Sequence, residues 1–300
     1  MTSTAPFGTV LTAMVTVFGE DGEVDLDQTQ KVATYLVDHG HDGLVVSGTT
    51  GESPTTTVAE DAETLAAVKD AVGDRAKIVA GVGTNDTRTT IELAQQAEKV
   101  GADGLLLVTP YYNKPGQRGI LQHFRQVAAA TDVPVILYDV PGRTGSPLSY
   151  ETYREAAGWD TVVAVKEAAG DLARGTKLLD LGYALYSGDD ALNLAWLAHG
   201  ASGVISVAGH VAGDYLRTMV DAMTDTGEGA DLVLARQTYA RMLPAIDAIM
   251  GVPNYGATTA KAALELLGVI DNRRVRSPLV ELDDDEVAAL RAGLAAAGLL

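Results

Sequence analysis

Short apolar runs rich in β-branched residues recur along the first three quarters of the chain, and helical patterns separate most of them. The runs span residues 10–17, 43–47, 77–82, 104–109, 134–139, 162–166, 184–187 and 203–207. Apolar positions three or four residues apart predict amphipathic helices between them, as over residues 26–37, 60–72, 89–100 and 120–130. Strands that are apolar on both faces and alternate with helices indicate a parallel sheet covered on both sides.

Eight strand–helix units in this length of chain predict an α/β fold, a (β/α)8 or TIM barrel, which typically takes ~250 residues. A doubly wound open sheet is the alternative fold. It is less favoured, because no Gly-x-Gly-x-x-Gly sequence follows the first strand. We expect the barrel to form one domain over residues 1–225.

The pattern changes after a polar, glycine-containing segment at residues 224–229, which is typical of a turn. Helical patterns then cover residues 231–250, 258–267 and 284–297, and a segment with glycine and proline at 251–256 interrupts them. We expect residues 226–300 to form a C-terminal helical extension that covers the barrel or mediates assembly.

The composition narrows the possible partners. Hydrophobic residues make up 47% of the 300 residues, which is enough for a large core. A net charge of -18 argues against nucleic acid and anionic membranes as partners. Without cysteine, the chain forms no disulfide and no cysteine-ligated metal site. No apolar run reaches membrane-spanning length and residues 1–10 do not resemble a signal peptide, so we expect a cytoplasmic protein.

One lysine ends an apolar strand. Lys166 closes the run at residues 162–166, whereas the other seven lysines lie in segments expected to be helices, turns or surface. Burial disfavours an ammonium and favours the free amine, which can attack a carbonyl. Glu167 is not expected to pair with Lys166, because neighbouring strand residues point to opposite faces. A structural lysine held by another carboxylate is the alternative at this point.

Polar and glycine-rich residues gather at the expected carboxyl ends of the strands, where barrel enzymes place their chemistry. After strand two, Thr49 and Thr50 offer hydroxyls beside backbone N–H groups that suit a small carboxylate, or they simply cap a helix. Tyr138 ends strand five, where a phenol can relay protons or pack as a core tyrosine. Arg143 follows in a turn and can bind a second carboxylate, or lie on the surface.

Other kinds of site have little support. No His-Glu-x-x-His sequence or carboxylate cluster predicts catalytic zinc, and no Gly-x-x-x-x-Gly-Lys-Ser/Thr loop predicts a nucleotide. Barrels bind phosphate after strands seven and eight, but here Asp189 and Asp190 follow strand seven and would repel it. We therefore expect no metal and no separate cofactor.

Six segments together resemble the dihydrodipicolinate synthase family, pyruvate-dependent class I aldolases also called 4-hydroxy-tetrahydrodipicolinate synthases. The resemblance covers residues 7–212, with the segments in order and at the spacing of the family. They are Gly48-Thr49-Thr50-Gly51-Glu52-Ser53, Thr109-Pro110-Tyr111-Tyr112-Asn113-Lys114-Pro115, Tyr138-Asp139-Val140-Pro141-Gly142-Arg143, Val165-Lys166-Glu167-Ala168, Ser187-Gly188-Asp189-Asp190 and Gly203-Val204-Ile205-Ser206-Val207. Val17 and Asp139 depart from the proline and asparagine that are common in the family, and its C-terminal Asn-Pro-x-Pro-x-Lys pattern is absent.

The resemblance implies a lyase that condenses pyruvate with L-aspartate 4-semialdehyde, in lysine and diaminopimelate biosynthesis. Lys166 would form a Schiff base with pyruvate and so replace any other cofactor. Thr49 and Thr50 would hold the pyruvate carboxylate, and the main chain at Gly188 and Ile205 would line the pocket.

The resemblance also implies a shared site. Tyr138, Thr50 and Tyr112 would form a proton relay in which Tyr112 comes from a neighbouring subunit of a homotetramer, built as a dimer of dimers. Arg143 would bind the carboxylate of the semialdehyde. Its presence speaks against a sister lyase acting on N-acetylneuraminate or a 2-keto-3-deoxy sugar acid. A barrel that binds a keto acid and regulates without turnover is the alternative from another class.

Lysine inhibits some members of the family through a pocket at the dimer interface. Asn85 and Tyr111 of that pocket are present here. However, Val58 and Asp61 occupy positions that carry histidines in the sensitive enzymes, and Thr89 occupies the glutamate position. We predict that this chain is insensitive to lysine.

Overall fold

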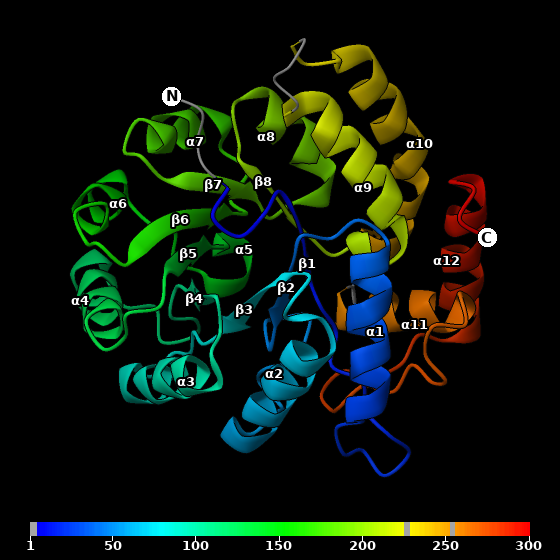
Figure 1. Ribbon diagram of the computed structural model, residues 1–300, viewed down its shortest axis with the longest axis horizontal. Helices are drawn as coiled ribbons and strands as arrows, with labels where there is room; N and C mark the ends of the chain where they lie inside the picture. Colours follow the sequence, from blue (N-terminus) through cyan, green and yellow to red (C-terminus); the bar gives the residue numbers. More distant parts are fainter. Residues whose placement is uncertain (1–4, 225–228, 253–255) are drawn as a thin grey trace.

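The computed structural model describes residues 5–224, 229–252 and 256–300, and it confirms the (β/α)8 barrel. Eight parallel strands pair in chain order, and β8 closes the barrel on β1 (Figure 1). The strands are β1 (Val10–Ala13), β2 (Gly43–Val46), β3 (Lys77–Gly81), β4 (Gly104–Val108), β5 (Val135–Asp139), β6 (Val162–Glu167), β7 (Ala184–Ser187) and β8 (Gly203–Ser206). All eight predicted strands are therefore present.

Helices surround the barrel as a ring (Figure 1). They are α1 (Leu26–Asp38), α2 (Val58–Val72), α3 (Thr87–Val100), α4 (Gln117–Ala128), α5 (Pro141–Thr144), α6 (Tyr150–Ala156), α7 (Leu172–Leu179), α8 (Asn193–Ala198) and α9 (Gly209–Thr224), with a 3-10 turn, η1 (Asp190–Leu192), before α8. Side-chain caps set where two of them begin. Thr57 and Glu60 cap α2 reciprocally, and Asp86 accepts a hydrogen bond from Thr89 N at α3. Both helices consequently begin two residues earlier than the apolar pattern predicts.

The C-terminal extension is helical, as predicted. It contains α10 (Leu232–Met250), α11 (Ala257–Leu266) and α12 (Asp284–Ala296). These helices lie together beside α9 on one side of the barrel (Figure 1), and apolar residues of α9, α10, α11 and α12 share one cluster with Val10 and Val204 of the barrel. The predicted domain boundary at 225/226 falls outside the described residues and stays a prediction. No helix within the described ranges is long and apolar enough to cross a membrane.

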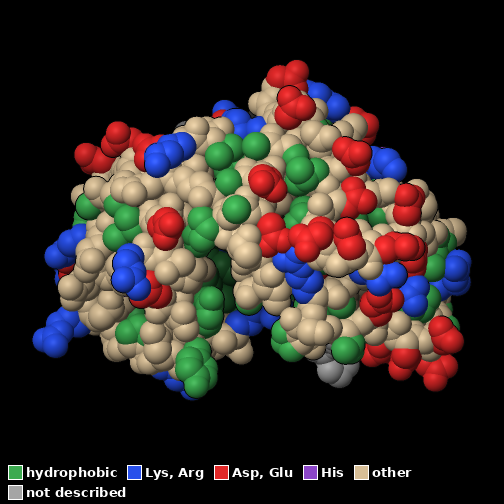
Figure 2. Space-filling view, turned by 90° about the horizontal axis from the view of Figure 1, so that it is seen from below, with side chains coloured by type: hydrophobic (Ala, Val, Ile, Leu, Met, Phe, Trp, Pro, Cys, Tyr) green, Lys and Arg blue, Asp and Glu red, His purple; other side chains and the backbone are tan. Residues whose placement is uncertain are grey.

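The surface is strongly acidic, in line with the net charge of -18. On the face shown in Figure 2, Asp and Glu side chains gather mainly on one half, interspersed with fewer Lys and Arg side chains. Apolar side chains lie around a central hollow on the same face. Like charges repel one another, so a surface of this kind favours solubility and costs some stability in the compact state.

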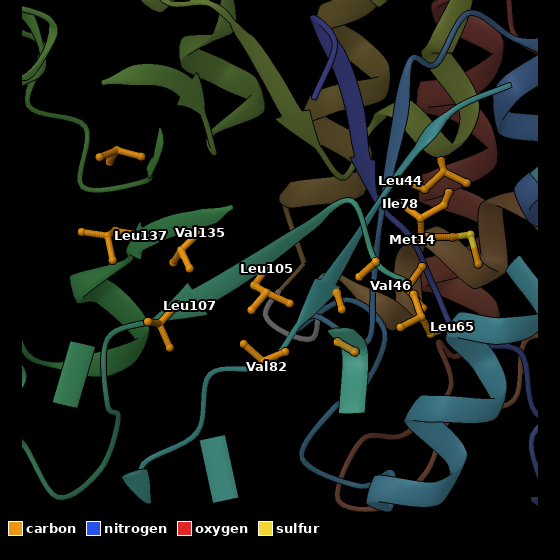
Figure 3. Packing of buried hydrophobic residues seen from close by; sticks show 14 of the residues in the cluster. Met14, Leu44, Val46, Leu65, Ile78, Val82, Leu105, Leu107, Val135 and Leu137 are labelled. Carbon is orange, nitrogen blue, oxygen red and sulfur yellow. The ribbon is translucent and has the colours of Figure 1, made fainter. Parts of the chain in front are cut away.

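The core has two layers because successive strand residues point to opposite faces. Leu105 and Leu107 of β4 point outward into the layer between barrel and helices, together with Leu44, Val46, Ile78, Val135 and Leu137 (Figure 3). Leu106 and Tyr138 belong to the cluster inside the barrel. This alternation turns Lys166 inward with Tyr138, and it turns Asp139 and Glu167 outward.

Candidate active site

Lys166 and Tyr138 lie side by side at the mouth of the barrel. They are register partners on the paired strands β6 and β5, and the Lys166 Nζ lies 4.4 Å from the centroid of the Tyr138 ring. Both side chains are buried, Lys166 to 5% exposure. The sequence predicted this lysine at the end of a strand. The pairing of β5 with β6 brings the Tyr138 ring next to its amine.

Burial lowers the pKa of the Lys166 ammonium from 10.5 to about 8. The carboxylate of Asp190 opposes this shift, and the nearby Arg143 cation adds to it. At neutral pH, a pKa of about 8 leaves roughly a tenth of the lysine as free amine, against roughly 0.03% at the ordinary value. Lys166 is therefore a far better nucleophile than an exposed lysine.

Lys166 lines a cavity of about 150 Å³. Five of the predicted site residues share it with Lys166, namely Thr49, Thr50, Tyr138, Arg143 and Gly188. A Cβ at Gly188 would lie 2.9 Å from the Lys166 Cε, so any larger residue there would push the lysine side chain out of its present position. The cavity suits a small keto acid next to the amine.

The loop from β2 to α2 brings Thr49 and Thr50 to this cavity. Two residues in its first half have left-handed backbones, Ser47 at φ 55° and Glu52 at φ 59°. The Glu52 N–H donates to the Thr49 carbonyl at 3.1 Å, and the Ser53 N–H donates to the Gly48 carbonyl at 3.3 Å. This tight turn places Thr49 and Thr50 on the wall of the cavity that Lys166 also lines.

A second cavity of about 320 Å³ adjoins the first, and Tyr138, Arg143 and Thr49 line both. Arg143 lies on the short helix α5 and is exposed. Tyr112 lines the larger cavity but not the one that contains Lys166. It is 87% exposed and left-handed, with φ 70°, so the chain holds this phenol out toward solvent.

Three residues near Lys166 were not predicted to belong to the site. Val207, just after β8, lines the cavity. Ile205, which was predicted to line it, is buried in the interior of the barrel. Met250 reaches the cavity from α10, in the region that was expected to cover the barrel or mediate assembly. Asp190 is buried, and its carboxylate accepts hydrogen bonds from Ser206 Oγ at 2.5 Å and from two backbone N–H groups after β8.

The outward faces of β5 and β6 carry a buried polar network behind the site. Asp139 accepts hydrogen bonds from Tyr153 OH at 3.0 Å and from Arg174 at 3.1 Å, and Arg174 also donates to Glu167 at 2.9 Å. Glu167 therefore pairs with Arg174 and not with Lys166, as the strand alternation predicted. The network ties together the two strands whose inward faces carry Tyr138 and Lys166.

A second lysine is also buried, which the sequence did not indicate. Lys261 of α11 is fully buried, its Nζ lies 2.5 Å from Glu52 Oε1, and burial lowers its pKa to about 8 as well. The pKa therefore does not distinguish the two lysines. Their surroundings do, because only Lys166 lines the cavity beside Tyr138, while Lys261 is sealed against a carboxylate. Among the described side chains, no group of three or more histidines and carboxylates is placed to hold a metal.

Comparison with known proteins gives a consistent result. A sequence model of the dihydrodipicolinate synthetase family matches residues 6–297. The chain is similar to the 4-hydroxy-tetrahydrodipicolinate synthase of Kineococcus radiotolerans, with 55% identity over 98% of this chain and 94% of the relative. That of Acidothermus cellulolyticus is 54% identical over the same shares. The crystal structure of the enzyme from Cyanidioschyzon merolae with lysine bound superimposes with a TM-score of 0.93 at 39% identity, covering 99% of this chain and all of the other.

Proposed function

The chain belongs to the dihydrodipicolinate synthetase family, and we propose that it condenses pyruvate with L-aspartate 4-semialdehyde to give 4-hydroxy-tetrahydrodipicolinate. This lyase reaction serves lysine and diaminopimelate biosynthesis. The observation that carries the proposal is a buried lysine with a lowered pKa, set against a tyrosine in a small cavity.

Lys166 is the proposed nucleophile. Its free amine attacks the keto carbon of pyruvate, and loss of water leaves a Schiff base that withdraws electrons from the neighbouring methyl group. Loss of a methyl proton gives an enamine, whose carbon adds to the aldehyde of the second substrate. The amino group of that substrate then replaces Lys166 at the former keto carbon, which closes the ring and frees the enzyme. No cofactor beyond this substrate-derived adduct is needed.

Thr49, Thr50 and Tyr138 are proposed to bind and protonate the first substrate. All three line the Lys166 cavity, where the threonine hydroxyls suit the pyruvate carboxylate and the Lys166 amine lies over the Tyr138 ring. The proposed proton relay runs from Tyr138 through Thr50 to Tyr112 of a neighbouring subunit. The exposure of Tyr112 supports this arrangement, because the phenol is free to enter a partner's site. Gly188 and Ile205 are proposed to contribute main-chain atoms to the pocket.

Arg143 is proposed to bind the carboxylate of the semialdehyde. It lines both cavities, so its guanidinium lies where a second substrate would meet the pyruvate adduct. A guanidinium binds a carboxylate through two parallel hydrogen bonds. This residue disfavours the sister lyases, whose sugar substrates have a neutral polyol at that end.

Product formation tests the function directly. Purified enzyme is given pyruvate with aspartate semialdehyde, and, in parallel, N-acetylneuraminate and a 2-keto-3-deoxy sugar acid. We expect turnover of the first pair only, measured by coupling the product to the next reductive step. Cleavage of either sugar acid, with no condensation, would overturn the proposal in favour of a sister lyase. Adduct formation with pyruvate but no turnover of any substrate would indicate a regulatory barrel.

We also propose a cytoplasmic homotetramer built as a dimer of dimers.

A further inference from the structure

A buried ion pair joins the C-terminal extension to the loop that carries Thr49 and Thr50. Lys261 Nζ of α11 donates to Glu52 Oε1 at 2.5 Å and to the Arg274 carbonyl at 2.7 Å. The other Glu52 oxygen accepts from the Arg276 N–H at 2.9 Å. Glu52 is 2% exposed and Lys261 is fully buried, so both carboxylate oxygens are held by the C-terminal region away from solvent.

Glu52 is placed to control the shape of this loop. It follows Thr50 by two residues, and its own N–H closes the turn on the Thr49 carbonyl. Its φ of 59° lies in the left-handed region, which residues other than glycine adopt only when the surroundings hold them there. The two bonded carboxylate oxygens are such a restraint. The ion pair therefore acts directly on the turn that presents the threonine hydroxyls.

Arg276 holds the rest of the same loop. Its guanidinium donates to the Thr55 carbonyl at 2.9 Å and to Glu60 at 2.5 Å, at the start of α2. Both cations contact the Phe18 ring, whose centroid lies 4.2 Å from Lys261 Nζ and 4.3 Å from the Arg276 guanidinium carbon. The segment from Glu52 to Glu60 is thus fixed at both ends by residues of the C-terminal region.

Neither member of the pair takes part in the chemistry. Glu52 and Lys261 do not line either cavity of the site. Burying two charges costs solvation, and well-packed apolar residues often stabilise a fold as well or better. What a buried, hydrogen-bonded pair supplies is a fixed geometry for the loop that carries it.

We propose that Lys261 and Glu52 are positioning residues through which α11 holds the Thr49 and Thr50 hydroxyls in the geometry that binds the pyruvate carboxylate. This inference rests on the proposed function. It gives the C-terminal extension a role in substrate binding, in addition to covering the barrel.

The test compares Lys261→Met, Glu52→Gln and the double variant with a matched control, Arg273→Met. Arg273 belongs to the same region and pairs with Glu265 at 2.6 Å, but it does not touch the 48–60 loop. For each protein, the pyruvate concentration that gives half-maximal borohydride trapping at Lys166 is measured by mass spectrometry. The KM for semialdehyde at saturating pyruvate and the hydrogen exchange of amides 48–60 are measured on the same samples.

We expect the half-saturating pyruvate concentration to rise about tenfold in both single variants, as for a weakened charge-assisted contact. The double variant should be no weaker than the singles, because both residues act through one contact. Amides 48–60 should exchange faster in these variants, while the semialdehyde KM and all readouts of Arg273→Met stay within about twofold of the unsubstituted enzyme. Lys261→Met leaves a buried carboxylate without its cation, which can prevent folding. Glu52→Gln keeps a hydrogen-bonding amide, so it is the variant that better preserves the fold.

Unchanged half-saturation and exchange would overturn the inference. So would a loss of folded, trappable protein with unchanged half-saturation, or failure of both single variants to fold, because the pair would then hold the fold and not the loop. Failure of the proposed function shows differently, as no condensation of pyruvate with the semialdehyde by the unsubstituted enzyme. The exchange readout still reports on the loop in that case.

Discussion

Lys166 and Lys261 are both buried lysines with a pKa lowered to about 8. They differ in the groups that surround the amine. Lys166 faces a cavity and the ring of Tyr138, so its amine can meet a substrate. Lys261 is bonded to a carboxylate and a carbonyl, so its amine is already occupied. A lowered pKa makes a lysine reactive only where a carbonyl compound can reach it.

The lowered pKa of Lys166 gives a pH dependence with a definite sign. The nucleophile is the deprotonated amine, so its fraction falls about tenfold for each pH unit below the folded pKa of about 8. We expect the initial rate of pyruvate adduct formation to rise with pH and to level off above about 8. Borohydride trapping at early times, from about pH 6 to about pH 10, measures it. A midpoint near the ordinary lysine value would show that burial does not tune this amine.

Arg143 is expected to select the second substrate. In Arg143→Lys, a point charge replaces the planar fork, so kcat/KM for the semialdehyde should fall roughly tenfold or more, mainly through KM. Pyruvate trapping at Lys166 should be retained. Arg125→Lys, which alters an exposed arginine paired with Glu155, serves as the control. Unchanged semialdehyde kinetics in Arg143→Lys would remove this role from Arg143.

Individual site residues could be predicted from the sequence where a single strand determines the position of the side chain. Lys166 and Tyr138 lie at the carboxyl ends of apolar strands, so their position along the strands was enough to predict that they lie at the barrel mouth. The positions of Asp190 and Met250 near Lys166, and the burial of Lys261, were not predicted. Their places depend on how a loop folds back or how a distant helix packs, and no local pattern encodes that.

At the scale of elements, the apolar pattern located every strand, and tertiary packing decided where some of them end. The first apolar run continues to residue 17, but β1 ends at Ala13. Met14, Val15 and Val17 stay buried because they pack in the outer core layer after the chain leaves the barrel. Apolar character therefore reports burial, and it does not distinguish a strand from a buried connection.

Helices α2 and α3 carry Asp61 and Thr89, two of the residues on which the predicted insensitivity to lysine rests. Asp61 of α2 accepts a hydrogen bond from the Thr56 hydroxyl at 2.8 Å, and the Thr89 hydroxyl of α3 donates to Asp86 at 2.8 Å. Both polar groups are thus engaged within the chain. A lysine ligand would also lack the glutamate replaced by Thr89, a contact worth roughly 1.5–3 kcal/mol, or about ten- to a hundredfold in affinity.

We therefore expect little inhibition by lysine. The measurement is the initial rate against lysine concentration at saturating pyruvate. Half-inhibition below the millimolar range would show that other residues of this chain build a working lysine site. The relative from Cyanidioschyzon merolae, whose structure has lysine bound, is a suitable positive control for lysine binding.

At the scale of the whole molecule, one chain does not complete the proposed proton relay. Tyr112 is 87% exposed and lies outside the lysine cavity of its own chain. The proposed tetramer supplies this phenol from a partner. In a twofold dimer, each chain would provide its Tyr112 to the site of the other chain. Variants with different defects should therefore complement each other.

Complementation between Tyr112→Phe and Lys166→Ala tests this arrangement. A mixed dimer has one site with both Lys166 and a partner Tyr112, so random pairing should restore about a quarter of the unsubstituted activity. The two variants are co-expressed, and activity is measured with sedimentation equilibrium on the same samples. Each variant alone should have low activity. A fully active monomer, or no complementation in proven mixed oligomers, would contradict a shared site.

The most direct test of the account is the identity of the lysine that forms the Schiff base. Enzyme treated with pyruvate and borohydride is digested, and the modified peptide is identified by mass spectrometry. We predict one pyruvate adduct, at Lys166, and none at Lys261 or any other lysine. Lys166→Ala should give no adduct and no product. An adduct at another lysine, together with an active Lys166→Ala enzyme, would contradict the central claim.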